Sequence, residues 1–138
     1  MKKLFVITAL ILFSGIVFGQ SLQKGGVVAI HEWTLKLKPD VTMNQFLDYW
    51  EETIIPEMEK LIPEMKGLTL KGIRSDNKYE YAGLYYYNSL EDFRKYWKED
   101  GSPTEAGAAI LEKFAPFLMK LSEFGEFTYT AKDWLINM

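Results

Sequence analysis

The sequence predicts an α+β domain in which a four-stranded antiparallel sheet carries helices on one face. Residues 27–135 alternate between stretches with the period of a strand and stretches with the period of a helix. Their order is strand, helix, strand, strand, helix, strand. Three of the strands carry side chains suited to burial on both faces, whereas one layer of helices covers a single face of a sheet. The other face therefore needs a partner, most simply a second copy of the chain.

The first 19 residues lie outside this domain and are predicted to be a secretory signal peptide. Two lysines precede an apolar run over residues 4–18, and a small residue, Gly19, stands at the exit. The run is shorter than the ~20 residues that a membrane-spanning helix needs, which argues against an N-terminal membrane anchor. We expect cleavage after Gly19, a single domain over residues 20–138, a secreted or periplasmic location and no stable membrane span after cleavage.

Composition excludes several classes of function. Without the leader, 14 basic residues face 19 acidic ones, which gives a net charge of about −5. Nucleic-acid binding needs a concentrated basic surface, so we expect no nucleic-acid partner. The chain has no cysteine, which rules out disulfides, thiol catalysis and thiolate metal sites. With one histidine and carboxylates that spread around a predicted helix, no metal site is expected.

The first half of the domain is predicted as a strand followed by a helix. β-favouring residues alternate between two faces over residues 27–38. Thr42 and Gln45 have the spacing of a reciprocal capping pair at the start of the helix. An apolar stripe at helical spacing follows, and Pro63 ends it. Pro56 lies inside the stripe and predicts a kink just before it, because proline lacks a backbone donor and clashes with the preceding turn.

The second half is predicted to add two strands, a short helix, a longer helix and a last strand. The strands cover residues 67–74, 78–87 and 126–135. Ser102 is the predicted N-cap of the longer helix, with Pro103 at its first position. With right-handed crossovers, this order packs as a ferredoxin-like β-α-β-β-α-β sandwich in which the first and third strands are central.

One face of the third strand is expected to carry four tyrosines: Tyr79, Tyr81, Tyr85 and Tyr87. An aromatic side chain buries about 150–250 Å². At about 25 cal/mol/Å², four of them represent on the order of 15 kcal/mol before entropic and polar costs. This is too much apolar surface to leave in water, so we expect a homodimer through the helix-free sheet face. The alternative is a face of tyrosines left in solvent.

Two short segments resemble a known superfamily. The sequence LKLKPD at residues 35–40 leads into a capped helix, and APFL at residues 115–118 precedes the last strand. Together with the order of elements, they resemble the dimeric α/β-barrel superfamily, in particular its antibiotic-biosynthesis-monooxygenase-like (ABM) branch. The resemblance implies half-barrels that pair sheet to sheet and a pocket between each sheet and its helices. Members include cofactor-free monooxygenases acting on polycyclic phenols, haem-degrading enzymes, sugar mutarotases and muconolactone isomerases.

His31 is the only histidine and the first candidate for catalysis. It is interpreted either as a general base facing the pocket or as a hydrogen-bonded histidine of the core or interface. Glu32 is the second proton-handling candidate, although it points to the other side of the strand, and a tyrosine is the third. The haem-degrading members carry their histidine on the second helical segment, whereas His31 lies on the first strand. That role is therefore not transferred, and no cofactor is expected.

Aromatic side chains predict a pocket for a small aromatic or apolar ligand, unless they simply fill the core. Tyrosine and tryptophan offer flat apolar walls with one polar group each. Arg74, at the end of the second strand, is interpreted either as an anchor for an anionic group of the ligand or as the partner of an acid at the sheet edge. The candidate ligand-binding residues are Trp33, Tyr49, Trp50, Arg74, Tyr85, Tyr87, Phe93, Trp97 and Phe114.

Three functions are left open by the sequence. The first is binding of a small apolar or aromatic molecule without catalysis. The second is a cofactor-independent monooxygenase or isomerase acting on a phenolic or quinol-like substrate. The third is a non-catalytic interaction module. An internal cavity of about 300 Å³ or more favours the first two, whereas a filled core with an exposed tyrosine face favours the third.

Overall fold

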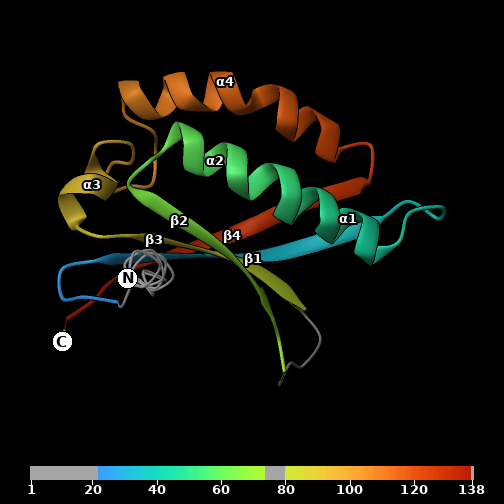
Figure 1. Ribbon diagram of the computed structural model, residues 1–138, viewed down its shortest axis with the longest axis horizontal. Helices are drawn as coiled ribbons and strands as arrows, with labels where there is room; N and C mark the ends of the chain where they lie inside the picture. Colours follow the sequence, from blue (N-terminus) through green and yellow to red (C-terminus); the bar gives the residue numbers. More distant parts are fainter. Residues whose placement is uncertain (1–21, 74–79, 138) are drawn as a thin grey trace, which may run out of the picture.

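The structure is a computed structural model that describes residues 22–73 and 80–137. The predicted signal peptide, Arg74 and Tyr79 lie outside these residues. The described chain forms the elements in the predicted order (Figure 1). They are β1 (Val27–Leu37), α1 (Met43–Tyr49), the π-helical turn η1 (Trp50–Ile54), α2 (Ile55–Leu61), β2 (Met65–Lys71), β3 (Tyr81–Tyr87), α3 (Leu90–Arg94), α4 (Glu105–Leu121) and β4 (Gly125–Leu135).

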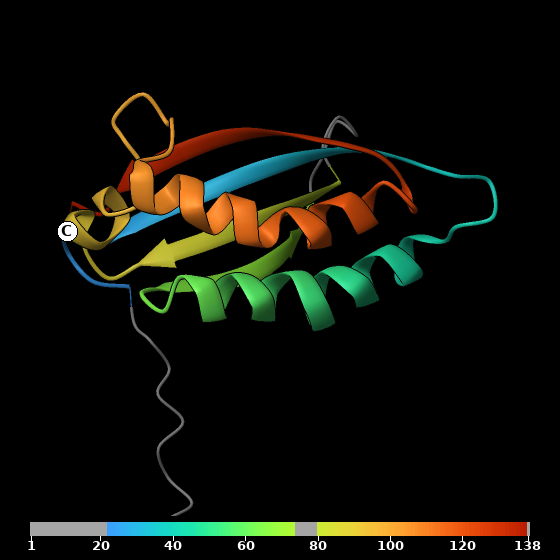
Figure 2. The same cartoon turned by 90° about the horizontal axis from the view of Figure 1, so that it is seen from above.

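The four strands form one antiparallel sheet in the order β2-β3-β1-β4. β1 and β3 are central, as predicted. β1 pairs with β4 along its whole length, from Val27 opposite Leu135 to Leu37 opposite Gly125. Figures 1 and 2 show α1, α2 and α4 on the same side of the sheet, with α4 running alongside the α1–α2 rod. The predicted α+β class and ferredoxin-like topology are confirmed.

The helical rod α1–η1–α2 starts at the predicted cap, Thr42, and its regular helix is interrupted before Pro56, as predicted. The Thr42 backbone N–H donates to Gln45 Oε1 at 2.8 Å, and the Gln45 N–H donates back to Thr42 Oγ1 at 3.3 Å. The break before Pro56 is a wide π-helical turn in which the Ile55 N–H donates to the Trp50 carbonyl. A proline ring has no N–H and collides with the carbonyl four residues earlier, and widening the turn relieves both problems.

The start of α4 differs from its prediction. Thr104, and not Ser102, is the N-cap, since its Oγ1 accepts the Gly107 N–H at 3.1 Å. Ser102 instead donates its hydroxyl to Asp100 Oδ1 at 2.6 Å and closes a local turn. Pro103 therefore precedes the helix and forms a bridge with Trp97. A Cβ on Gly107 would lie 2.1 Å from the Tyr96 carbonyl oxygen, so α4 starts in close contact with the end of the α3 region.

Tyr85 and Tyr87 of β3 point toward the helices, which corrects the expectation that they drive dimerisation, whereas Tyr86 lies on the helix-free face with Leu84. Tyr85 and Tyr87 are 4% and 2% exposed and belong to the core of the single chain. Period-two alternation places them on one face but does not say which face the helices cover. The helix-free face carries the alternate residues of β3, including Leu84, and Leu68 of β2, which is 59% exposed. No helix of the described chain has the length and apolar character of a membrane span.

Candidate functional site

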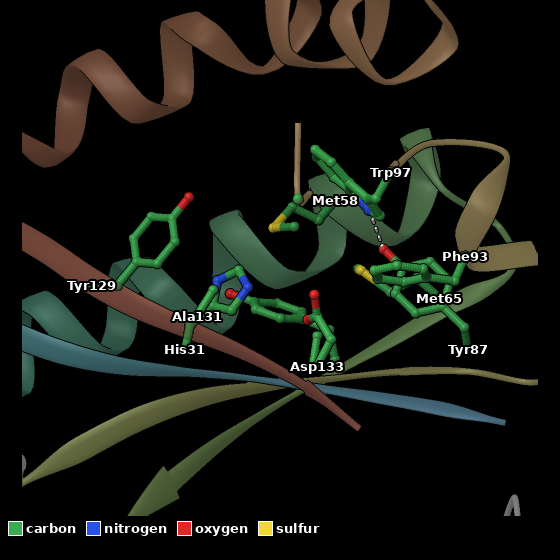
Figure 3. A pocket seen from close by; sticks show the side chains of 12 residues that line it. His31, Met58, Met65, Tyr87, Phe93, Trp97, Tyr129, Ala131 and Asp133 are labelled. Atoms are coloured by element: carbon green, nitrogen blue, oxygen red, sulfur yellow. Dashed lines mark hydrogen bonds between the residues drawn. The ribbon is translucent and has the colours of Figure 1, made fainter. Parts of the chain in front are cut away.

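A pocket of about 110 Å³ lies between the helix-facing side of the sheet and the helical layer (Figure 3). The floor comes from β1, β3 and β4. Met58 of α2 and Trp97, in the segment after α3, stand over this floor. This pocket is smaller than the ~300 Å³ typical of sites that enclose a drug-sized ligand, so the volume expected for an enclosed ligand is not reached. The exposed tyrosine face expected for an interaction module is absent at Tyr85 and Tyr87, which are buried. The pocket is lined by Ala29, His31, Met58, Met65, Tyr85, Tyr87, Phe93, Trp97, Gly101, Tyr129, Ala131 and Asp133.

His31 is held in the pocket by two aromatic neighbours. Its imidazole stacks on the ring of Tyr129, with centroids 4.5 Å apart and planes 1° apart. The ring of Tyr85 meets it edge-on at 4.8 Å. Tyr85 reaches this position by lying over Gly83, where a Cβ would stand 2.8 Å from the tyrosine hydroxyl oxygen. No hydrogen bond joins the imidazole to another described residue, and the alternative of a hydrogen-bonded core or interface histidine stays a prediction.

Burial keeps His31 neutral. Desolvation lowers the pKa of the imidazole from 6.5 to about 4, because the charged ring loses contact with water. Burial alone accounts for the lowered pKa, and no carboxylate hydrogen-bonds the ring in the part of the chain that the structure describes. At neutral pH the ring therefore offers one N–H donor and one nitrogen acceptor to the pocket.

The α3 side of the pocket is an aromatic wall. Trp97 Nε1 donates a hydrogen bond to the Tyr87 hydroxyl at 2.9 Å, and Phe93 meets the Tyr87 ring edge-on at 5.3 Å. Burial raises the pKa of Tyr87 to about 12, although the bond from Trp97 favours the phenolate. The hydroxyl is thus protonated at neutral pH and already holds one partner.

Asp133 supplies the carboxylate of the pocket. It lies on β4 opposite Ala29 of β1, and Figure 3 shows its side chain rising from the sheet between His31 and Tyr87. Desolvation raises the pKa of Asp133 above its usual value. Its carboxylate makes no side-chain hydrogen bond or ion pair with the other described residues. A ligand entering the pocket therefore meets an acceptor without a partner in the described part of the chain.

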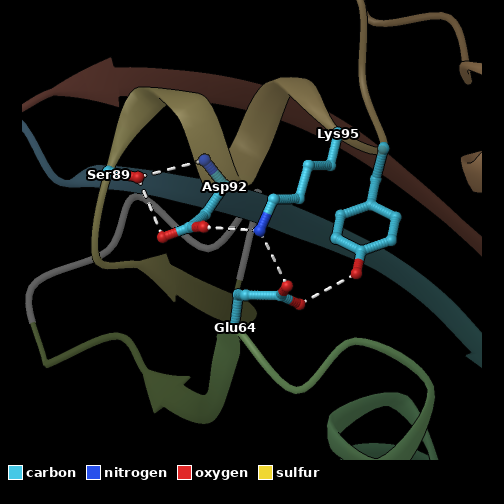
Figure 4. A network of polar contacts seen from close by, with 5 residues as sticks. Glu64, Ser89, Asp92 and Lys95 are labelled. Atoms are coloured by element: carbon cyan, nitrogen blue, oxygen red, sulfur yellow. Dashed lines mark hydrogen bonds and ion pairs between the residues drawn. The ribbon is translucent and has the colours of Figure 1, made fainter.

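A polar network fixes the segment that carries the aromatic wall (Figure 4). Lys95 Nζ donates to Glu64 Oε1 and to Asp92 Oδ1, each at 2.9 Å. The Tyr96 hydroxyl donates to Glu64 Oε2 at 2.8 Å. The bond from Lys95 is the largest cause that lowers the pKa of both carboxyls, with further bonds from Tyr96 to Glu64 and from Ser89 to Asp92. The start of β2 is thereby tied to the end of α3, next to Trp97.

Five of the residues singled out from the sequence meet in this pocket: His31, Tyr85, Tyr87, Phe93 and Trp97. Glu32 does not join them. It faces the helix-free side of β1, where Lys132 Nζ donates to its carboxylate at 2.9 Å. The alternation of a strand separates neighbouring residues in this way, and we leave Glu32 out of the site.

The other aromatic candidates belong to the core or lie away from the pocket. Trp33 and Trp50 pack together with centroids 4.4 Å apart, and their indole N–H groups have no partner among the described residues. Phe114 is buried against Phe117. The Tyr49 hydroxyl donates to the Phe117 carbonyl at 3.1 Å. Arg74 lies outside the described residues, so its role as an anion anchor stays a prediction.

Sequence reasoning missed the contribution of β4. Tyr129, Ala131 and Asp133 alternate along the face of β4 that lines the pocket. The sequence did carry a signal for this contribution. Asp133 interrupts an apolar alternation on β4, the strand that pairs with β1, which carries His31. Met58 and Met65 were missed as well, because a methionine at such a position is as compatible with the hydrophobic core as with a pocket wall. Across the described ranges, no group of three or more possible metal ligands comes together.

The chain is similar to known proteins in its fold only. No protein-family model matches the chain, and no curated protein matches it. SnoaB, a cofactor-independent oxygenase from Streptomyces nogalater, has a similar structure, with a TM-score of 0.51 at 14% identity. The match covers 83% of this chain and 95% of SnoaB. This likeness confirms the predicted fold and the resemblance to the ABM-like proteins at the level of fold.

Two further structures are similar at lower scores. A dimeric protein of unknown function with a ferredoxin-like fold, from Bacteroides fragilis, has a TM-score of 0.43 at 18% identity, over 84% of this chain and all of its own. An ethyl tert-butyl ether D (EthD) family protein from Bacillus halodurans has a TM-score of 0.44 at 19% identity, over 78% of this chain and 96% of its own.

Proposed function

We propose that the protein binds a small apolar or aromatic molecule that carries a polar group, without assigned catalysis, as an exported homodimer. The observation that carries the proposal is the set of unpaired polar groups in an aromatic pocket. The His31 imidazole, the Tyr85 hydroxyl and the Asp133 carboxylate all border the pocket, and none has a hydrogen-bond partner in the described chain. A buried polar group without a partner costs free energy, so a ligand that pairs with the His31 imidazole and the Tyr85 hydroxyl is stabilised, whereas the Asp133 residue is exposed and offers a charge.

The size of the pocket limits the ligand. An apolar cavity of about 150 Å³ in another protein accepts benzene. A pocket of about 110 Å³ that is open on one side therefore suits one ring or a compact apolar group, with the rest of the molecule outside. Polycyclic molecules, which the resemblance implies for some relatives, do not fit inside it.

The basicity of His31 favours binding over catalysis. A general base works best with a pKa near the working pH, whereas burial holds the pKa of His31 at about 4. A cofactor-independent monooxygenase or isomerase is the second candidate. The fold shared with SnoaB supports it, and so does a neutral imidazole able to accept a hydrogen bond from a phenol. Phenol turnover that is unchanged in His31→Ala would exclude histidine chemistry.

The homodimer is proposed to form through the helix-free face of the sheet. Leu68, Leu70 and Trp134 are exposed there, and the register aligns Leu68, Leu84 and Ile30 across three strands. Burying such an apolar row against a second sheet is favourable. Export is proposed from the leader over residues 1–19, and N-terminal sequencing of the exported protein tests it, with Gln20 expected as the first residue.

The binding proposal is tested by calorimetry with phenol, catechol, benzyl alcohol and benzylamine. Ala131 lies on the pocket floor, so Ala131→Leu is expected to fill the pocket and weaken binding of any positive ligand at least about tenfold. Ala109→Leu makes the same change on the exposed side of α4 and should leave binding unchanged. Binding that survives Ala131→Leu, or the absence of binding across the whole panel, overturns the proposal.

A further inference from the structure

The charge of the pocket has one sign. Among its lining residues Asp133 is the one carboxylate, and neither lysine nor arginine is present. His31 adds no positive charge, because its imidazole is neutral at pH 7. An anionic ligand would face a carboxylate with no cation to offset it. A cationic ligand would find an unpaired counter-ion.

The rest of the lining also favours a cation. Five aromatic rings border the pocket: Tyr85, Tyr87, Phe93, Trp97 and Tyr129. The negative face of an aromatic ring attracts an ammonium group, and the attraction grows as the group is desolvated. The methionines Met58 and Met65 contribute polarisable, uncharged sulfur atoms. A wall of rings beside one carboxylate is the chemistry that recognises small ammonium ions.

We propose that the polar group of the ligand is an ammonium, held between the Asp133 carboxylate and the aromatic rings. This inference rests on the binding function proposed above and specifies the class of ligand. The compact head of an organic ammonium suits a pocket of about 110 Å³, and its apolar substituents lie against the rings. His31 and the Tyr85 hydroxyl then accept hydrogen bonds from any N–H that the ligand carries.

The two cations that share a hollow with Asp133 form no ion pair with its carboxylate among the described residues. Arg94 and Lys98 line a neighbouring hollow that shares Asp133 with the pocket. Arg94 Nη2 donates to Glu99 Oε1 at 2.7 Å, which gives the guanidinium a different partner. No ion pair links Lys98 to Asp133 in the described chain. The carboxylate is therefore available to a ligand cation on the side of the pocket.

Acid should release the cation. Desolvation raises the pKa of Asp133, so its charge is lost at a higher pH than that of an ordinary aspartate. The titratable groups that share the pocket with it are His31, Tyr85, Tyr87 and Tyr129, and those that share the neighbouring hollow are Arg94, Lys98 and Glu99. Both tyrosines of β3 in the pocket stay protonated, since burial raises their pKa values. Protonation of His31 near pH 4 adds a positive charge, so both titrations weaken cation binding as the pH falls.

A matched pair of probes tests the inference. Choline and 3,3-dimethylbutan-1-ol have nearly the same shape and differ by one positive charge. Calorimetry on the full exported protein at pH 7 is expected to show choline binding at least about tenfold more tightly than the neutral alcohol. Asp133→Asn keeps the shape of the side chain and should remove most of this difference. Asp48→Asn, on the exposed side of α1, is the control and should leave it intact.

The outcomes separate this inference from the binding function. The ammonium inference is overturned if the neutral alcohol binds as tightly as choline or more tightly, or if choline does not bind. It is also overturned if the preference for choline survives in Asp133→Asn. If the neutral members of the phenol panel still bind and Ala131→Leu blocks them, the pocket binds small molecules and only the charge of the ligand is wrong. If no probe of either set binds, both proposals fail.

Discussion

The imidazole of His31 lies parallel to the ring of Tyr129, with 4.5 Å between the ring centroids and 1° between their planes. The two residues come from neighbouring strands, because His31 of β1 stands opposite Ala131 of β4 and Tyr129 is two residues further along. Tyr129 is 55% exposed, so the stack forms one side of the pocket rather than a core contact. It shields the imidazole from water on one face, while the ring nitrogens have no hydrogen-bond partner among residues 22–73 and 80–137.

The buried imidazole makes stability dependent on pH. Folding favours the neutral ring, so the stability that it contributes above pH 6.5 is lost as the pH falls from 6.5 to about 4. The shift in pKa corresponds to at most about 3 kcal/mol of unfolding free energy. We expect urea titrations at pH 7 and pH 4.5 to show this loss in the unaltered protein and a smaller one in His31→Gln. Carboxyl titrations occur in both proteins and cancel in the difference.

The same residue offers a direct check by NMR. As the only histidine, His31 gives a single pair of imidazole signals that need no assignment by mutation. Their titration should have its midpoint near pH 4. A midpoint between 6 and 7, the range of an ordinary histidine, would contradict the burial and the neutral imidazole on which the site is built.

Gly83 allows Tyr85 to reach His31. A Cβ at position 83 would lie 2.8 Å from the Tyr85 hydroxyl oxygen, closer than atoms approach without displacement. We expect Gly83→Ala to push the buried Tyr85 ring aside and to lower the unfolding free energy by about 1–3 kcal/mol. Tyr85→Phe removes the nearest clashing atom, so the double variant should recover part of the loss. Strictly additive effects in this double-mutant cycle would mean that the two residues do not collide.

The fold could be predicted from the sequence because its signals are local. Strand and helix periods, the Thr42–Gln45 cap and the break before Pro56 each depend on residues a few positions apart. Which face of β3 the helices cover depends instead on how distant segments pack. Period-two alternation shows which residues share a face, but it does not show which face lies against the helices. The tyrosines were for that reason assigned to the dimer, although Tyr85 and Tyr87 line the pocket.

The site was predicted in part for the same reason. His31 and the aromatic residues of β3 and of the α3 region were found because their residue types stand out in the sequence. Tyr129 and Asp133 enter the pocket only through the pairing of β4 with β1, a contact between residues about a hundred positions apart. The N-cap of α4 was placed two residues early, because Ser102 has a closer partner in Asp100 than in the helix.

Lys95 holds the end of α3 against the start of β2. Its ammonium bridges Glu64 and Asp92, and the chain continues from it directly into Tyr96 and Trp97. We expect Lys95→Met to speed amide hydrogen exchange at Tyr96 and Trp97 while global stability changes little, since the ion pairs are exposed. Lys98→Met is the matched control, because no ion pair of Lys98 is found in the described chain. If Tyr96 and Trp97 exchange at the same rate in both variants, the network does not support the pocket wall.

The helix-free face is expected to be the interface of a dimer, and one leucine tests it. Leu68 stands opposite Leu84 of β3, which stands opposite Ile30 of β1, so three apolar side chains form a row across the sheet. A stable interface buries about 800 Å² per partner, and a charge at the end of this row would have to be desolvated. Leu68→Glu should therefore weaken association at least about tenfold.

Sedimentation velocity at micromolar concentration measures the association. Leu111→Glu makes the same change on α4, where Leu111 is 38% exposed against 59% for Leu68, and should leave the dimer intact. Circular dichroism of both variants checks that the fold is retained. If the unaltered protein is a monomer, the proposed dimer does not form. If a dimer survives Leu68→Glu, its interface lies elsewhere on the surface.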